Sequence, residues 1–173
     1  MGSRRLTSLR GALVLFVALV AQIAIVADLR IVGAVGDLML LVTVAAALTG
    51  GPDRGVTYGF VGGVLFDLAL DSPFGLSALT YAVVGYAVGL VCGGLFRPTG
   101  WSPLVVAAVA ALVATAFYTG VGHLIGTPYP WGDLPAITAA VALWNAALVL
   151  PTMALLRWVH GPTEPDRLEV VLR

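Results

Sequence analysis

Long apolar runs separated by short turns dominate the sequence. A membrane-spanning helix needs about 20 mostly apolar residues, with a range of about 17–25. Six candidate spans follow one another: residues 11–27, 31–48, 55–70, 75–96, 102–125 and 134–159. The connections between them are short and rich in Gly, Pro, Asp and Ser, which are typical turn residues. The sequence therefore predicts an all-α integral membrane protein, with one domain (1–173) built as a compact six-helix bundle and a short tail over 160–173.

The composition excludes a soluble protein. Hydrophobic residues make up 60% of the chain and charged residues 10%, against about 45–50% and about 25% in ordinary soluble domains. Nine basic and nine acidic residues cannot give a chain of 173 residues a polar shell. The formal net charge is zero, so nucleic acid is not an expected partner. The single cysteine, Cys92, excludes an intrachain disulfide and a thiolate metal cluster.

The placement of arginine sets the expected orientation, because arginine is retained in the cytoplasmic loops of membrane proteins. With six spans and the N-terminus inside, eight arginines fall on the cytoplasmic side and only Arg30 falls outside. Both termini are then cytoplasmic. The basic start and the first apolar run also resemble a signal peptide, but the run exceeds a signal core of about 7–15 residues and lacks an A-x-A-like cleavage site. We expect a retained anchor.

Two rows of glycine, spaced i, i+4, i+8, mark one face of each of two neighbouring spans. The rows are Gly55, Gly59 and Gly63, and Gly85, Gly89 and Gly93. In a bilayer, small residues let helix backbones approach, so that dispersion contacts drive association. Glycine at an ordinary helix position costs about 1 kcal/mol relative to alanine, so the rows predict a close helix crossing. Two interpretations stay open: packing within the chain, or docking of a partner subunit, including a second copy in a homodimer.

Three aspartates lie at one expected boundary of the bundle. Asp37 and Asp71 fit a helix N-cap and a turn residue. Asp67 continues the first glycine row and lies about a turn of helix from water, so it is expected to face a neighbouring helix. An unpaired carboxylate there would be costly. We expect it to accept hydrogen bonds from the backbone amides that open the next span near Gly75 and Leu76, with a protonated, neutral Asp67 as the alternative.

Other polar residues of the spans have structural interpretations. Asn145 lies mid-span, where a buried amide is expected to bond across helices for roughly 0.6–2 kcal/mol. Pro151 lacks a backbone donor and is expected to kink its helix. His123, near the end of the fifth span, fits an interfacial or packed histidine better than a ligand.

No enzyme class fits the sequence well. The nearest approach to an intramembrane serine protease is Ser77 with His123, but the surrounding Gly75-Leu76-Ser77-Ala78 lacks the second glycine of a nucleophile loop. No phosphate-binding loop, H-E-x-x-H motif or Cys/His cluster is present in the sequence. We expect no catalytic residue, no bound metal and no cofactor. The short, glycine-broken second and third spans keep a transporter open as an alternative.

A family resemblance rests on four segments in the centre of the chain. They are Asp37-Leu38-Met39-Leu40-Leu41, Gly55-x-x-x-Gly59-Phe60-x-Gly62-Gly63-x-x-x-Asp67, Ser72-Pro73-Phe74-Gly75-Leu76 and Gly85-Tyr86-x-x-Gly89. Together they resemble the rod-shape-determining membrane protein MreD family. The likeness continues to Asn145 and Pro151, and the length and span count also fit.

The resemblance implies a small polytopic protein of the bacterial inner membrane that works in the cell-elongation machinery without known catalytic activity. The implied partners are MreC, a bitopic periplasmic scaffold, and the assembly of a SEDS glycosyltransferase, a class B penicillin-binding protein and MreB. The resemblance also implies a helical fold like that of the substrate-binding S-components of energy-coupling-factor vitamin transporters. A substrate-binding subunit of such a transporter is therefore the alternative function. A deep outward cavity with convergent polar groups would favour it.

Overall fold

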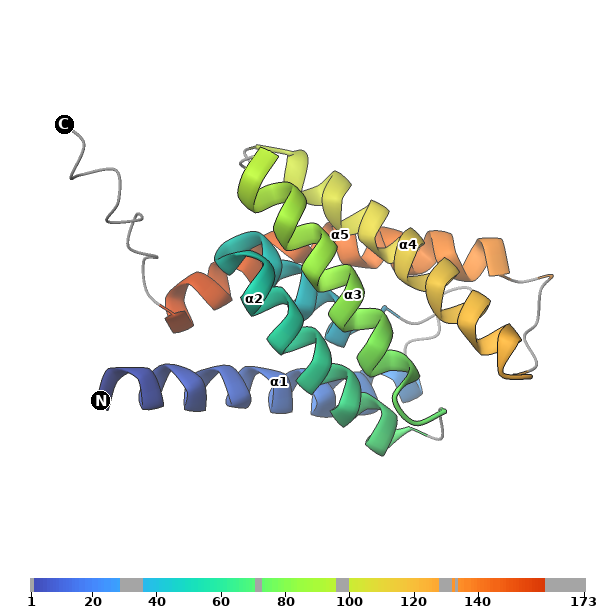
Figure 1. Ribbon diagram of the computed structural model, residues 1–173, viewed down its shortest axis with the longest axis horizontal. Coiled ribbons are helices and arrows are strands. Elements are labelled where there is room, and N and C mark those ends of the chain that lie inside the picture. The colour runs from blue at the N-terminus through green and yellow to red at the C-terminus, as the bar shows by residue number, and fades with distance from the viewer. Residues whose placement is uncertain are drawn as a thin grey trace.

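The computed structural model describes residues 2–28, 36–70, 73–95, 100–127, 132 and 134–160. Its elements are α1 (Gly2–Asp28), α2 (Leu38–Ala69), α3 (Leu76–Leu90), the π-helical turn η1 (Val91–Leu95), α4 (Ser102–Leu124) and α5 (Leu134–His160). The described residues form helices and connecting turns and no strand, so the prediction of an all-α fold is confirmed. Figure 1 shows the helices packed into one bundle, with α1 along its lower edge.

The second and third predicted spans form one continuous element, α2, with a sharp turn inside it. Gly51 takes φ 78° and ψ −171°, a conformation that side chains disfavour and glycine allows. Pro52 then restarts the helix with its fixed φ. The connection predicted between residues 48 and 55 is thus reduced to a single non-helical residue, and the six predicted helices appear as five α-helices.

The turn folds the arm 38–50 of α2 back along the arm 52–69. A Cβ atom placed on Gly55 would lie 2.9 Å from the Cβ of Ala47, and one on Gly62 would lie 3.4 Å from the terminal methyl of Met39. At 1.5 Å per residue, the first arm is about 20 Å long and the second about 27 Å. Both arms are shorter than the roughly 30 Å hydrocarbon core of a bilayer.

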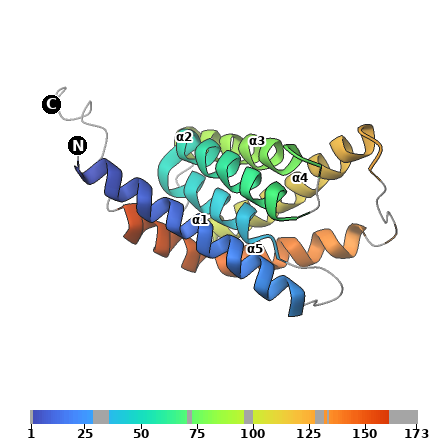
Figure 2. The same cartoon turned by 90° about the horizontal axis from the view of Figure 1, so that it is seen from below.

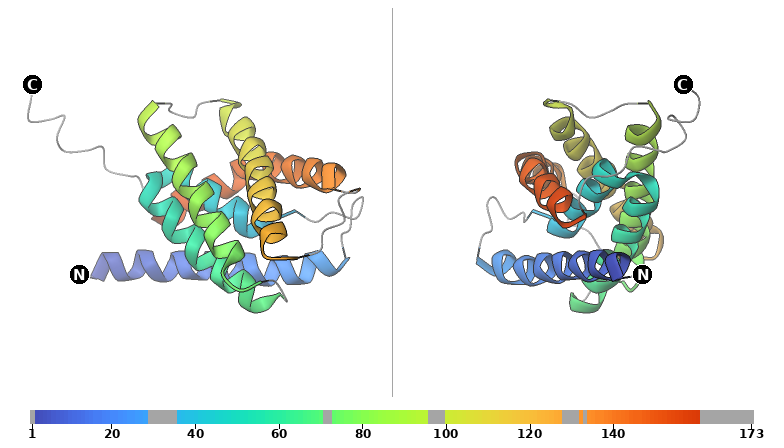
Figure 3. Two further views of the ribbon diagram at one scale, coloured as in Figure 1. Left: turned by 45° about the vertical axis from the view of Figure 1, so that its right-hand side comes forward. Right: turned by 90° about the vertical axis from the view of Figure 1, so that its left-hand side faces the viewer.

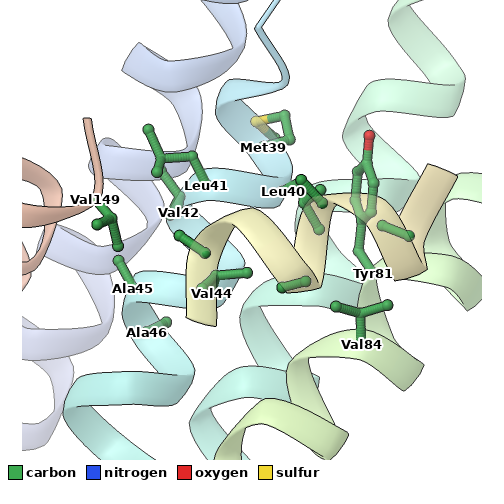
Figure 4. Close-up of a cluster of buried hydrophobic side chains, with 14 of the residues drawn as sticks. Met39, Leu40, Leu41, Val42, Val44, Ala45, Ala46, Tyr81, Val84 and Val149 are labelled. Carbon is green, nitrogen blue, oxygen red and sulfur yellow. The ribbon is translucent and has the colours of Figure 1, made fainter. Parts of the chain in front are cut away.

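The first arm of α2 is the centre of the core. Every residue from 39 to 47 is buried, so this helix is apolar on all sides and is enclosed by protein. Figure 4 shows its side chains meeting Tyr81 and Val84 of α3 on one side and Val149 of α5 on the other. The right-hand view of Figure 3, toward the N-terminus of α1, shows α1, α3, α4 and α5 arranged around α2.

Within the described part of the chain, three helical stretches are long and apolar enough to cross a membrane by length and composition. They are Leu76–Gly93, Ser102–Leu124 and Leu134–His160, and α1 adds a shorter apolar stretch, Leu9–Ala24. α5 is assigned as helix through Pro151 without a break. The predicted bounds 31–48 and 75–96 include residues 31–35 and 96, which lie outside the described residues.

The bundle has two chemically distinct ends. The first turns of α1, the turn of α2 and the last turn of α5 lie toward the left in Figure 1. We call this the arginine end, which carries Arg10, Arg54, Arg157 and His160. The opposite end, which we call the carboxylate end, carries Gln22, Asp37, Asp67 and Tyr81. Figure 2 shows α1 and α5 on one side of the bundle and α2 and α3 on the other.

Candidate functional site

The glycine rows lie between the second arm of α2 and α3, where the two backbones touch. A Cβ on Gly55 would collide with the carbonyl of Gly85, and one on Gly59 with the carbonyl of Tyr81. Gly63 faces the backbone of Ala78 in the same way. Each of these approaches would be closer than 3.0 Å, which real Cβ atoms essentially never show. The α2–α3 contact therefore requires glycine, and this face is used within the chain.

The second row follows the same pattern for two of its three members. Gly85 approaches the carbonyl of Gly55, and Gly89 approaches the backbone of Pro52 just after the α2 turn. Gly93 is different, because its nearest neighbour is the Cδ of Pro52 at 3.9 Å, an ordinary contact. It lies in η1, and a π-helical turn shifts the register that the i+4 spacing assumes. The structure therefore places Gly93 beyond the close crossing.

Asp67 extends the first glycine row and closes the α2–α3 contact with hydrogen bonds. It is 5% exposed. Its Oδ2 accepts from the N–H of Gly75 at 2.8 Å and of Ala78 at 3.4 Å, and its Oδ1 accepts from the N–H of Ser77 at 3.3 Å. A carboxylate at a helix start satisfies amides that lack intrahelical partners and complements the helix dipole. Asp67 therefore has backbone amides at the start of α3 as partners.

Asp37 caps α2 and also joins α2 to α3. Its Oδ1 accepts from the N–H of Leu40 at 2.9 Å, which is the N-cap role expected from the sequence. Its Oδ2 accepts a hydrogen bond from the buried hydroxyl of Tyr81. Tyr81 also packs edge-on against Phe66, with ring centroids 6.0 Å apart. The third predicted aspartate, Asp71, lies outside the described residues.

Gln22 completes the carboxylate end, and the sequence reasoning missed it. Its side chain is 5% exposed. Its Nε2 donates to the carbonyl of Gly36 at 3.1 Å, while its Oε1 accepts from the N–H of Leu38 at 2.7 Å. The amide thus holds α1 to the start of α2. A glutamine inside an otherwise apolar run was the available signal, because a buried amide needs partners.

Among the described residues, two buried polar side chains each have one atom without a hydrogen-bond partner. Asn145 is 3% exposed, and its Nδ2 finds no acceptor in the described structure, so this donor does not make the hydrogen bond expected across helices. The hydroxyl of Ser77 is likewise without a partner there. Ser77 is buried in the first turn of α3, whereas His123 is exposed near the end of α4 and does have a partner. Neither environment suggests an activated nucleophile.

A cavity of about 330 Å³ opens at the carboxylate end. Its polar lining includes Gln22, Asp37, Tyr81, Thr115 and Tyr118. The first three are bonded to one another or to backbone, and the hydroxyl of Thr115 donates to the carbonyl of Ala111 at 2.9 Å. Tyr118 also has a partner. The surface of the cavity is mainly apolar, and each of these polar side chains already has a partner within the protein.

A hydrogen bond between two helices lies at the arginine end. The hydroxyl of Tyr58 lies 2.9 Å from Nε2 of His160, which joins α2 to the end of α5. Nδ1 of His160 lies 3.0 Å from the carbonyl of Leu156 and must donate to it, so the neutral ring accepts the proton of Tyr58 at Nε2. A Cβ on Gly11 of α1 would press on this Tyr58 hydroxyl. Three helices therefore meet here.

An all-helical bundle with long apolar helices and polar groups paired at its two ends defines a polytopic membrane protein. The sequence model of the family described as rod shape-determining protein MreD matches residues 3–159. The chain belongs to the MreD family. No curated protein and no solved structure matches it, so the likeness to S-components is not supported by a structural match.

Proposed function

We propose that this chain is a non-catalytic membrane scaffold of the bacterial rod complex, which binds MreC and supports lateral peptidoglycan synthesis. The observation that carries the proposal is the family match, which covers residues 3–159 and so extends over nearly all of the five α-helices. The further assembly consists of the SEDS glycosyltransferase, the class B penicillin-binding protein and MreB. This placement makes the protein a determinant of rod cell shape in the inner membrane.

We propose six crossings with both termini in the cytoplasm. The two arms of α2 lie antiparallel, and with α1, α3, α4 and α5 they give six helical passages between the two ends of the bundle. One end of the bundle carries Arg10, Arg54 and Arg157. Because arginine is retained on the cytoplasmic side of membrane proteins, this end is the one expected to face the cytoplasm.

Cysteine-accessibility labelling of single-cysteine variants in a Cys92→Ala background tests this topology. Cysteines at Ser72 and Thr127 should react with an impermeant reagent added outside the cell, whereas those at Thr49 and Thr99 should not. External labelling at Thr99 would exclude the six-crossing arrangement.

The α2–α3 crossing limits where a partner can bind. Because the backbones of α2 and α3 touch along Gly55, Gly59 and Gly63, a partner helix cannot use this face without separating them. We therefore propose that MreC contacts other surfaces of the bundle. The glycine rows support the scaffold indirectly, by fixing the shape on which the partner docks.

Affinity purification of the tagged full-length chain in mild detergent tests the partner assignment. We expect MreC to co-purify as a bitopic protein with a periplasmic coiled coil. The control is a tagged, unrelated polytopic membrane protein expressed at the same level. Absence of MreC from the eluate, with the chain folded, would contradict the scaffold proposal.

A substrate-binding subunit of a vitamin transporter is the second candidate, and the cavity at the carboxylate end is the observation in its favour. The pairing of its polar groups with one another weighs against it, since substrate would have to displace those bonds. Recovery of an ATPase module in the same purification would support this candidate. Recovery of MreC alone would support the scaffold.

A further inference from the structure

A groove of about 690 Å³ lies at the arginine end between α1, the second arm of α2 and the last turn of α5. Its walls are apolar on the α1 side, at Ala12 and Leu15, and polar on the α2 side, at Arg54 and Tyr58. Val61 continues the apolar part along α2. A groove with a cationic head and an apolar body has the amphipathic character of a membrane lipid.

Arg54 is the cation of this groove, and its position is fixed by the fold. Its side chain is half-buried and folds over Gly50, where an added Cβ would lie 2.5 Å from the guanidinium carbon. No hydrogen bond or ion pair joins its guanidinium to any residue that the structure describes. The guanidinium of Arg54 is thus held at the groove, with its N–H donors available to a ligand.

The neighbours of Arg54 refine the kind of ligand. The rings of Tyr58 and His160, with centroids 5.7 Å apart, form one wall of the groove. Their polar atoms already bond to each other and to the carbonyl of Leu156. Arg54 also lies in the first turn of the second arm of α2, where the helix dipole adds positive potential. Asp53 is exposed at the rim, and its negative charge disfavours a doubly charged ligand.

We propose that this groove binds the phosphodiester head group of an anionic phospholipid. The planar guanidinium of Arg54 matches phosphate oxygens with two parallel hydrogen bonds, and one acyl chain lies along Ala12, Leu15 and Val61. A single negative charge satisfies Arg54 and is repelled less by Asp53 than two negative charges would be. The proposal rests on placement in the membrane and not on binding of MreC, so it is tested on the purified chain alone.

Native mass spectrometry of the full-length protein in detergent measures the binding. Phosphatidylglycerol and phosphatidylcholine with identical acyl chains are titrated separately. We expect one retained phosphatidylglycerol with about tenfold higher affinity than phosphatidylcholine, whose choline would place a second cation beside Arg54. Arg54→Gln should remove this preference. The matched control Arg10→Gln, at the same end but outside the groove, should keep it.

A second variant keeps the test independent of charge. Ala12→Trp fills the apolar side of the groove from the exposed face of α1, and it should abolish the retained lipid while Arg54 is intact. Equal binding of the two lipids, an unchanged preference in Arg54→Gln, or an equal loss in Arg10→Gln would overturn the proposal. Glycerol phosphate binding as tightly as the lipid would also overturn it, because the site would then serve a soluble anion.

Discussion

The α2–α3 pair and α1 are held to the bundle by different means. Between α2 and α3 the backbones touch along Gly55, Gly59 and Gly63, and Asp67 bonds the end of one helix to the start of the other. α1 is attached through side chains, among them Gln22 toward α2 and Leu15 in the core, and much of its apolar surface stays exposed. A backbone contact leaves no room for an added side-chain atom, whereas an attachment through side chains can lose single contacts without separating the helices. Substitutions at the two sites should therefore differ in size and kind.

Gly59→Leu should have the largest effect of the substitutions considered. Its side chain would overlap the backbone of Tyr81 and force α2 and α3 apart, at a cost of about 3 kcal/mol or more. Folded yield in detergent and MreC recovery should both fall. The measurement is monodisperse yield in size exclusion, followed by thermal melting of what remains.

Gly120→Leu is the matched control for that substitution. Gly120 lies inside α4 with open space where a Cβ would stand, so leucine there should be neutral or slightly stabilising through helix propensity. If Gly59→Leu matched Gly120→Leu in yield and partner recovery, the backbones of α2 and α3 could not be in the contact described.

Asp67→Leu should be the next most damaging change. It removes the acceptor for three amides at the start of α3, which is expected to cost about 2 kcal/mol in the free energy of unfolding. Asp67→Asn keeps an acceptor oxygen but loses the charge, so it should lie between wild type and leucine. Melting temperatures in one detergent measure the series, with Asp37→Asn as a comparison that should lower stability less. A normal Asp67→Leu protein would refute the amide-paired role.

Gln22→Leu tests the attachment of α1 to the start of α2 at the carboxylate end. Losing its two hydrogen bonds to Gly36 and Leu38 should cost about 1 kcal/mol, as interhelical hydrogen bonds in membranes generally do. Because α1 is not part of the α2–α3 contact, folded yield should stay near wild type while proteolysis between α1 and α2 becomes faster. Ile23→Leu, on an exposed position of the same helix, should change neither. Unchanged proteolysis in Gln22→Leu would mean that other contacts hold α1.

Tyr58→Phe should give the smallest effect. It removes the hydroxyl that bonds to His160 but keeps the ring against the imidazole, so we expect a loss of about 0.5 kcal/mol. Thermal melting measures it, with Tyr86→Phe as the control on an exposed tyrosine of α3. A loss as large as that of Asp67→Leu would show that α5 depends on this contact far more than its geometry suggests.

Local spacing predicted much of the α2–α3 contact. The i+4 rows indicated a close crossing, and the row that runs from Gly63 to Asp67 put the carboxylate on the crossing face. Pro73-Phe74-Gly75 then marked a helix start within reach. These inferences used residues near one another in sequence, where helical periodicity decides which side chains share a face. The resemblance also led to the family that the chain belongs to.

Features that depend on contacts between distant segments were not predictable in this way. Tyr81 donates to Asp37 across 44 positions and Gln22 accepts from Leu38 across 16, and no periodicity links them. The single-residue turn at Gly51 and the shift of Gly93 by η1 depend on backbone conformations that spacing does not specify. Asn145 was placed in the interior from sequence, but its hydrogen bonding follows from which helices surround it.

The turn at Gly51 has a consequence for how the protein is made. The arm 38–50 is about 20 Å long, and its side chains from 39 to 47 contact protein on every side. If this arm left the translocon by itself, it would be too short to be a stable span. It would also have no neighbouring helices to enclose its side chains. It therefore has to wait for the arm 52–69, to which a single residue joins it. The α2 hairpin, rather than the individual helix, is the smallest part of this region that can partition into the bilayer during synthesis.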